Sequence, residues 1–306
     1  MKKLLIASTA LVMVAGAAAA EVKVTGDARF GLSYSEANTV NDITAEYRVR
    51  AKFNMSGKTD AGLGFGASFV LNGSSVNSTK TFADDTFLPA DANLDPDELS
   101  YFSDNTSDAM VWVSGTWGTV SVGEGVDTGD DSVGIGLADI GYKGIGVDDT
   151  AEALFANTNA NLNYTGTFGN VTVALSYDLP TSGNIAGSDD WAIGVGYKAG
   201  NYKVALGYAS DETLTVFGGA TFGAASVNAL YSTNDASGAD AWGFDASYKL
   251  NSATVITVAY ADDNGLTDAD YGVGVAYTLG GGAKLIGGLG SVNGVTKAEV
   301  GMTFSF

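Results

Sequence analysis

The sequence predicts an all-β protein: a transmembrane antiparallel up-and-down β-barrel of about 16 strands, with a long loop folded into its pore. Apolar and polar residues alternate with a period of two along most of the chain, as in strands with two different environments. Proline, which interrupts strand ladders, is scarce at 3 residues, whereas glycine reaches 42. Tight turns alternate with longer polar connections, such as 210–214, 232–241 and 261–270, as expected for an up-and-down array with two unlike ends.

Residues 1–20 have the features of a secretory signal peptide. Lys2 and Lys3 precede an apolar stretch over 4–14, and three alanines at 18–20 provide a small-residue cleavage site. A membrane-anchoring helix is the alternative, but the apolar stretch is too short to span a bilayer. The predicted barrel therefore occupies residues 21–306. Without Lys2 and Lys3, this part retains 13 of the 15 bases against all 35 acids.

The first two predicted strands show the alternation most clearly. In the segment 22–34, Val24, Phe30 and Leu32 share one face, and Asp27 and Arg29 lie on the other. In the segment 46–55, apolar residues again share one face. Three bases occupy the opposite face at every second position: Arg48, Arg50 and Lys52.

The same pattern recurs in later segments, with weaker candidates at 63–71, 109–114 and 119–123. A tyrosine stands just before each of several tight turns, which predicts a ring of aromatic residues at one membrane interface. These tyrosines are Tyr164, Tyr197, Tyr248 and Tyr277. The clearer recurrences span 162–177, 191–208, 214–231, 242–260, 271–289 and 298–306.

A soluble all-β protein also alternates, so other features must decide between the two classes. The apolar faces of these segments carry no charge, and no linker or change of composition divides residues 21–306. In hydrocarbon every backbone polar group must be paired, which a sheet achieves by closing into a barrel. We therefore favour a membrane barrel with polar residues inside, and the basic residues of the first two strands then face the lumen.

The composition excludes most enzyme mechanisms. The chain has no cysteine and no histidine, so it lacks thiol chemistry, Ser-His-Asp triads and imidazole zinc sites. We predict that the protein is not an enzyme and requires no cofactor. Calcium is possible at acidic loops, because it prefers oxygen ligands. The sequences DDS and DDT match no calcium-loop motif, so no metal ligand is assigned.

The segment 124–159 does not alternate, and a structureless loop of this length is usually functional. It holds apolar residues that a solvated loop would not need, so we expect it to fold into the lumen and narrow it. Its acids would face the bases of the first two strands and create a transverse field. A solvated strand face and an external loop are the alternatives. The apolar residues are Val133, Ile135, Leu137, Ile140 and Ile145.

Several segments together resemble the general diffusion porins of alphaproteobacterial outer membranes, of the Rhodobacter type. EVKVTGDARFGLSY is similar to the opening strand of that family, and YRVRAKFNMSGKTDAGLGFGASF to its second and third strands. SGTWGTVSVGEG resembles the strand that enters the constriction loop. VGMTFSF resembles the terminal signal that the outer-membrane assembly machinery reads, with Phe304 and Phe306 as its aromatic residues.

The resemblance implies a homotrimer in the outer-membrane lipid of a Gram-negative bacterium, passing ions and small hydrophilic solutes by passive diffusion. No nucleic-acid partner is expected. The alternative is a secreted or surface-bound β-rich binding protein, either an adhesin or a calcium-stabilised lectin. The resemblance places a basic wall at the constriction, made of Lys23, Arg29, Arg48, Arg50 and Lys52. It takes the opposing loop acids from Asp130, Asp131, Asp139, Asp148, Asp149 and Glu152.

Overall fold

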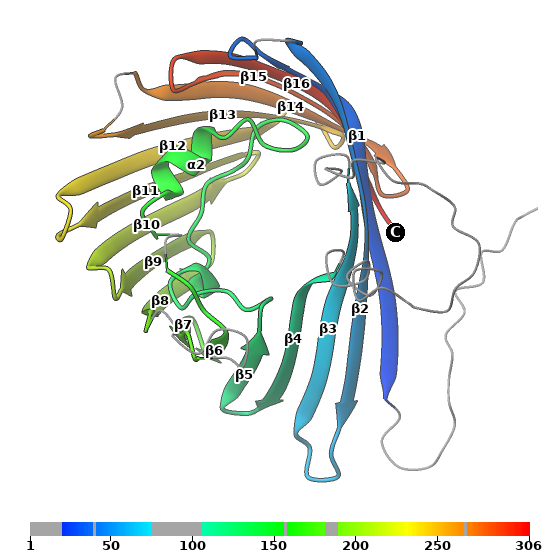
Figure 1. The fold of residues 1–306 in the computed structure, drawn as a ribbon, viewed down its shortest axis with the longest axis vertical. Coiled ribbons are helices and arrows are strands. Elements are labelled where there is room, and N and C mark those ends of the chain that lie inside the picture. Colours follow the sequence, from blue (N-terminus) through cyan, green and yellow to red (C-terminus); the bar gives the residue numbers. More distant parts are fainter. Residues whose placement is uncertain (1–19, 39–40, 75–105, 156–157, 181–188, 266–267) are drawn as a thin grey trace, which may run out of the picture.

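The computed structural model describes residues 20–38, 41–74, 106–155, 158–180, 189–265 and 268–306. Residues 1–19, which hold almost all of the predicted signal peptide, lie outside the described part. Sixteen antiparallel strands follow one another around a closed barrel, and β16 returns to pair with β1 (Figure 1). The predicted fold class is confirmed, including the strand number and the long loop inside the barrel.

The strands account for most of the described chain, and the only helical turns lie in the loop between β5 and β6. The strands are β1 (Glu21–Ser35), β2 (Ile43–Lys58), β3 (Gly64–Ser74), β4 (Thr106–Gly115), β5 (Gly118–Gly123), β6 (Leu162–Phe168), β7 (Val171–Tyr177), β8 (Trp191–Ala199), β9 (Tyr202–Ala209), β10 (Thr213–Phe222), β11 (Ala225–Asn234), β12 (Ala239–Lys249), β13 (Thr254–Asp263), β14 (Asp270–Gly280), β15 (Ala283–Val292) and β16 (Val295–Ser305). The helical turns are the 3-10 turn η1 (Asp131–Val133) and the short helix α2 (Val147–Glu152).

Pairing between the first and last strands closes the sheet. The register runs from Asp27 opposite Ser305 to Ser35 opposite Lys297. The end of the chain continues this ladder, because Gly26 and Phe306 exchange backbone hydrogen bonds of 3.2 and 2.8 Å. Each of the described strands therefore has two neighbouring strands, and the sheet closes on itself as a barrel.

Two connections at the rim opposite the tight turns are shorter than the sequence predicts. Tight turns such as 200–201 and 281–282 form one rim, and the loop between β5 and β6 leaves from the other. The predicted long connections at 210–214 and 232–241 are wrong in length. The flanking strands extend into them, so that only 210–212 and 235–238 remain as connections between strands. Side chains shorten them: Asp211 accepts from the Thr213 amide at 3.1 Å, and Asn234 from the Ser237 amide at 2.8 Å. Such Asx turns close a connection in few residues.

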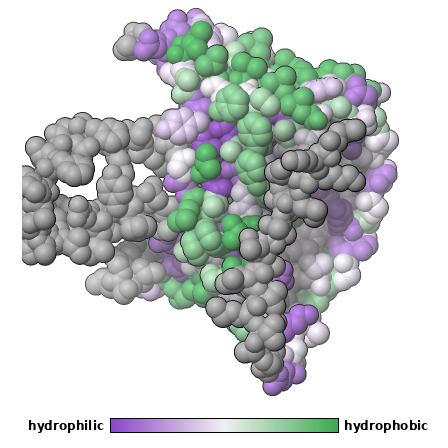
Figure 2. All heavy atoms as spheres, turned by 90° about the vertical axis from the view of Figure 1, so that its right-hand side faces the viewer, coloured by the Kyte–Doolittle hydropathy of each residue, from purple (hydrophilic) through white to green (hydrophobic). Residues whose placement is uncertain are grey.

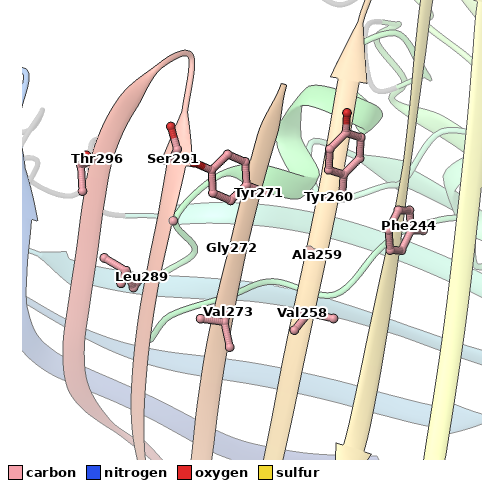
Figure 3. Close-up of a pocket in the computed structure, with 11 residues that line it drawn as sticks. Phe244, Val258, Ala259, Tyr260, Tyr271, Gly272, Val273, Leu289, Ser291 and Thr296 are labelled. Atoms are coloured by element: carbon pink, nitrogen blue, oxygen red, sulfur yellow. The ribbon is translucent and has the colours of Figure 1, made fainter. Parts of the chain in front are cut away.

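The outer face of the barrel is apolar. Hydrophobic residues cover much of the face seen in Figure 2. On the far side of the barrel, Val258 lies opposite Val273 and Tyr260 opposite Tyr271 in the ladder between β13 and β14, with the rings at one level (Figure 3). Large exposed side chains of this kind include Val49 at 58%, Leu206 at 54% and Val300 at 51%. So much apolar surface outside a closed sheet suits contact with hydrocarbon rather than water.

Aromatic side chains border this apolar face at both rims. The predicted ring near the tight turns contains the exposed tyrosines Tyr197, Tyr248 and Tyr277, and Tyr164 donates to the carbonyl of Trp117 at 2.6 Å. A second group of rings lies near the opposite rim. Its hydroxyl groups donate to acids there: Tyr177 to Asp189, Tyr231 to Asp240 and Tyr260 to Asp262. Two aromatic levels are typical of a barrel whose middle lies in lipid.

Residues 124–155 and 158–161 of the connection between β5 and β6, hereafter the inner loop, lie inside the barrel along its wall (Figure 1). Its isoleucines Ile135, Ile140 and Ile145 are buried, and Val133 and Leu137 are partly buried. Together they pack on inward residues of the strands such as Ala205, Ala259 and Val292. Two bulky inward residues, Phe217 and Leu230, join this contact and are only 2% and 3% exposed. The inner face is therefore apolar beneath the inner loop, in contrast to the uniformly polar face that the sequence predicts.

Inward glycines make room for the inner loop. A methyl group at Gly288 would lie 2.8 Å from Ile140 Cγ2, and one at Gly274 would lie 3.0 Å from the same atom. A methyl group at Gly301 would lie 2.6 Å from the Tyr142 ring. Similar contacts join Gly194 to Val133, Gly207 to Ile135 and Gly243 to Leu137. We call these inward positions the glycine track: Gly31, Gly194, Gly207, Gly243, Gly272, Gly274, Gly288, Gly290 and Gly301.

Adding a side chain to the glycine track should displace the inner loop. We expect Gly288→Val to weaken its docking by about 1–3 kcal/mol, the usual cost of overpacking. Hydrogen exchange at residues 139–152 should then become faster. Gly218→Val is the matched control, because Gly218 lies on β10, where a methyl group meets no atom within 4 Å. Unchanged exchange in Gly288→Val would contradict the packing described.

Candidate functional site

The five predicted wall bases all point into the lumen from β1 and β2. In the ladder between these strands, Arg29 lies opposite Arg48 and Thr25 lies opposite Lys52. Their neighbours Phe30 and Val49 are exposed on the outer face, at 52% and 58%, so alternation directs the bases inward. The three arginines are adjacent, whereas Lys23 and Lys52 lie nearer the rim of tight turns.

An acid on the same wall pairs with two of the arginines. Asp27 accepts from Arg50 Nε at 3.0 Å and from Arg48 at 3.3 Å. These groups are partly exposed, so the pairs contribute at most about 1 kcal/mol each, but they orient both guanidinium groups. Sequence reasoning placed Asp27 on the correct face and did not include it in the site. Its position two residues before Arg29 could have indicated this role, because residues two apart on a strand share a face.

The charge of this wall is nevertheless positive. The charged neighbours that act on Arg48 are Arg29, Arg50 and Asp27. Asp27 pairs with Arg48 and Arg50, and Glu299, which interacts with Arg29, also accepts a hydrogen bond from the inner loop. The five bases therefore outnumber the acids beside them. Such an arrangement attracts anionic groups and orients dipolar solutes that pass it.

The inner loop crosses from one side of the lumen to the other. Its η1 turn contacts β7 and β8, and α2 contacts β11 to β15. Between them, Tyr142 reaches β1, where its hydroxyl lies 3.5 Å from Ser33 Oγ. The inner loop thus lines a large part of the wall, and its middle, at Tyr142 and Lys143, lies next to the strands that carry the arginines.

The one base of the inner loop anchors it to the wall. Lys143 forms an ion pair with Glu46 on β2, and its backbone amide donates to Glu299 on β16 at 3.2 Å. Glu46 lies on the inward face two residues before Arg48. Sequence analysis counted Lys143 only as a charge, although a single lysine among eight acids is itself a signal of a specific partner.

The six predicted loop acids lie in two environments. Asp131, Asp139 and Asp149 are exposed on the lumen side of the inner loop. Asp130 and Asp148 are buried, at 1% and 7% exposure. Glu152 is half-buried. It accepts a hydrogen bond from the Leu137 amide at 2.6 Å, which connects α2 to the part of the inner loop that precedes it. The exposed acids are therefore the ones available to solutes.

Burial raises the pKa values of three acids of the inner loop. Burial, with Asp139 close by, raises the pKa of Asp148 to about 7. Burial likewise raises the pKa of Glu152 to about 7, even though the hydrogen bond from Leu137 opposes the shift. Burial also raises the pKa of Asp130. A buried carboxyl favours its neutral form because the charged form loses its hydration.

Three wall acids that sequence reasoning missed hold the inner loop in place. Asp245 on β12 accepts from the Ala138 amide at 3.1 Å and from Asn228 at 2.8 Å. Asp270 on β14 accepts from the Thr150 hydroxyl, and Glu299 accepts from Lys143. All three are at most 7% exposed. Nothing in a linear sequence marks them, because their partners are 107 to 156 residues away.

The two terminal aromatic residues lie at the rim of tight turns. Phe304 stacks on Phe30 with ring centroids 6.0 Å apart and on Phe306 at 6.4 Å, and Phe306 is 78% exposed. Among the described residues, no group of three or more acids is arranged to hold a metal ion. No helix in the described part is long and apolar enough to cross a membrane.

Comparisons with known proteins agree with this architecture. The model of the family described as Gram-negative porin matches residues 7–297. A porin of Rhodobacter capsulatus is 29% identical, and a porin of Fuscovulum blasticum is 26% identical. Each alignment covers 94% of this chain and 100% of the relative.

Solved structures show the same fold. A mutant of the Rh. blastica porin superposes with a TM-score of 0.74 at 24% identity, covering 93% of this chain and 100% of that one. The secreted adhesin or lectin alternative has no support in these comparisons. The apolar outer face, the closed sixteen-stranded sheet and the family match lead to one conclusion: this chain belongs to the Gram-negative porin family, as a multi-pass protein of the outer membrane.

Proposed function

We propose that this porin forms a water-filled channel through which ions and small hydrophilic solutes diffuse passively, with a charged constriction at the inner loop. The observation that carries the proposal is the closed barrel, apolar outside, with a loop docked on its inner wall. A sixteen-stranded barrel is wide enough to leave an aqueous channel. Family membership supports a channel rather than an enzyme.

The constriction in this proposal has a basic side and an acidic side. Arg29, Arg48 and Arg50 supply the basic side, extended toward the rim by Lys23 and Lys52. The exposed Asp131, Asp139 and Asp149 supply the acidic side, supported by the orientation of the inner loop toward the lumen. Opposite charges about 10 Å apart interact by roughly 0.4 kcal/mol in water and 1.7 kcal/mol at an effective dielectric constant of 20. Several such pairs orient polar solutes and disfavour apolar ones.

The buried acids have a different role in this proposal. Asp130, Asp148 and Glu152 stabilise the position of the inner loop and do not contact solutes. The acid excess of the chain then gives the channel a mild cation preference, which the arginines moderate. The proposal needs no cofactor. Calcium is proposed only as an ion that the exposed acidic loops attract from solution, because carboxylates are its usual ligands.

We further propose a homotrimer embedded in outer-membrane lipid. The porin relatives support an oligomer. Phe304 and Phe306 are proposed as the terminal signal for the outer-membrane assembly machinery. The exposure of Phe306 at the rim of tight turns supports this role.

Channel formation is tested most directly in a planar bilayer. The purified protein should require detergent for solubility and should produce discrete, stable conductance steps after insertion. Steps that appear in groups of three would support the trimer. A protein that stays dispersed without detergent, or that passes no ion current, would overturn the proposed function.

The arginines and Asp27 should change ion selectivity in opposite directions. Arg48→Gln with Arg50→Gln should increase cation preference, whereas Asp27→Asn should decrease it. A unit charge about 4 Å from a passing ion contributes roughly 1 kcal/mol in water, so the permeability ratio should change by about five-fold. Reversal potentials in a salt gradient measure this ratio. Lys58→Gln, at the rim, is the control and should have a smaller effect; equal shifts would remove the arginines from the constriction.

Docking of the inner loop should weaken as pH rises. Free carboxyl groups have pKa values of about 4, whereas those of Asp148 and Glu152 in the docked loop are about 7. Between pH 4 and pH 7 the docked inner loop therefore binds more protons than an undocked one. This contribution to the stability of docking is fully present below about pH 4 and is lost as pH rises through 7. Hydrogen exchange at residues 147–155, corrected for intrinsic rates, should show less protection at about pH 8 than at about pH 5.

Glu152→Gln provides the control for this pH dependence. Glutamine keeps an oxygen that can accept from Leu137 and has no titrating group, so protection should depend less on pH. Protection that rises with pH in the unmodified protein would show that burial does not control docking.

A further inference from the structure

Lysines gather at one end of the barrel interior. Lys58, Lys198, Lys203, Lys249 and Lys284 are all on inward positions within two residues of a tight turn. In the described part of the chain, only two acids, Glu21 and Asp60, lie at this rim. The acids concentrate instead on the inner loop and at the opposite rim. A channel that is acidic overall therefore has a basic vestibule below the inner loop.

The pairing of β8 with β9 places two of these lysines side by side, and neither has an acid of the described part as an ion-pair partner. Lys198 on β8 and Lys203 on β9 are directly opposite in the ladder, and like charges in this position destabilise a sheet. Neither forms an ion pair with a described carboxylate. The acid that acts on Lys203 is Asp245, and both of its oxygens already accept hydrogen bonds from Asn228.

The pair borders a niche beneath the inner loop. The niche has a volume of about 250 Å³ and is lined by Val133 and Gly134 of the inner loop, by Thr172, and by the two lysines. Its remaining lining residues include Gly196, Ala205 and Phe217. The Nζ atom of Lys203 lies 4.3 Å from the centre of the Phe217 ring. Two cations, one hydroxyl group and apolar walls thus surround a space of roughly eight water volumes.

We propose that this niche is a binding subsite for small organic oxyanions, such as a dicarboxylate or a phosphate ester. Oxygens of one anion would accept hydrogen bonds from both ammonium groups and relieve their repulsion, and charge-assisted bonds of this kind are strong. The carbon skeleton would lie against Val133, Ala205 and Phe217. Thr172, Lys198, Lys203 and Phe217 occupy inward positions on their strands, so the ligand is a solute dissolved in the lumen rather than a lipid headgroup. The inference rests on the proposed channel function.

The test uses the full-length protein in detergent and in planar bilayers. Succinate and inorganic phosphate are titrated at low salt by calorimetry, and each is then added on the side of the tight turns while the current is recorded. We expect saturable binding and a saturable reduction of the current. Lys198→Gln with Lys203→Gln should lower the affinity at least about ten-fold, because hydrogen bonds between charged groups are lost.

Lys249→Gln with Lys284→Gln is the matched control. It removes the same charge from the same rim but leaves the niche intact, so the affinity should change by less than about two-fold. Equal losses in the two double variants would overturn the subsite and leave only a diffuse positive field. Conductance at high salt checks folding of each variant. A wild-type protein that conducts but binds neither anion would refute the subsite alone, whereas one that does not conduct would refute the channel.

Discussion

The fit between apolar side chains of the inner loop and the glycine track determines the rest of this structure. Ile140 approaches the inner wall so closely that a methyl group at Gly288 would lie 2.8 Å from it. Close packing of this kind fixes a segment in one position, because interiors tolerate little added volume. It converts a long polar connection into part of the wall, and it decides which loop acids face solvent. In the sequence analysis the abundance of glycine indicated only extended sheet. The structure adds a second reason: inward glycines leave room for the apolar side chains of the inner loop.

In each of the two Asp-Asp pairs of the inner loop, packing places the two neighbouring acids in different environments. Asp130 and Asp148 are buried, whereas Asp131 and Asp149 are exposed. The buried member of each pair lies against the wall and favours its neutral form. The exposed member of each pair lies toward the lumen, where it can meet a passing solute. Wall acids such as Asp245 complete the attachment by accepting from backbone amides of the inner loop. A carboxylate count taken from the sequence therefore overstates the charge that a passing solute meets.

The period of two predicted the strands well, because each strand separates two environments whatever its neighbours are. Inward placement of Arg48 and Arg50 followed from the same rule. Their pairing with Asp27 did not, because it depends on the register between β1 and β2. The contacts of Lys143 with Glu46 and Glu299 were equally hidden, since they join the inner loop to strands 97 and 156 residues away. Connection lengths at 210–212 and 235–238 were overestimated because polar turn residues can continue a ladder once their side chains close the turn.

The outer face also explains where the charges of this protein lie. A base near the middle of the lipid-facing surface costs about 2–4 kcal/mol, so the strands can carry charge only inward or at a rim. In the described part of the chain, the charged side chains therefore lie in the lumen and at the two rims. The acids gather at the rim of the inner loop, the arginines lie beside that loop, and the lysines gather at the rim of tight turns. A solute crossing the barrel meets an acidic entrance, a constriction of mixed charge and a basic vestibule. The charge of the described lining therefore differs between the two ends of the barrel, and the inner loop lies between them.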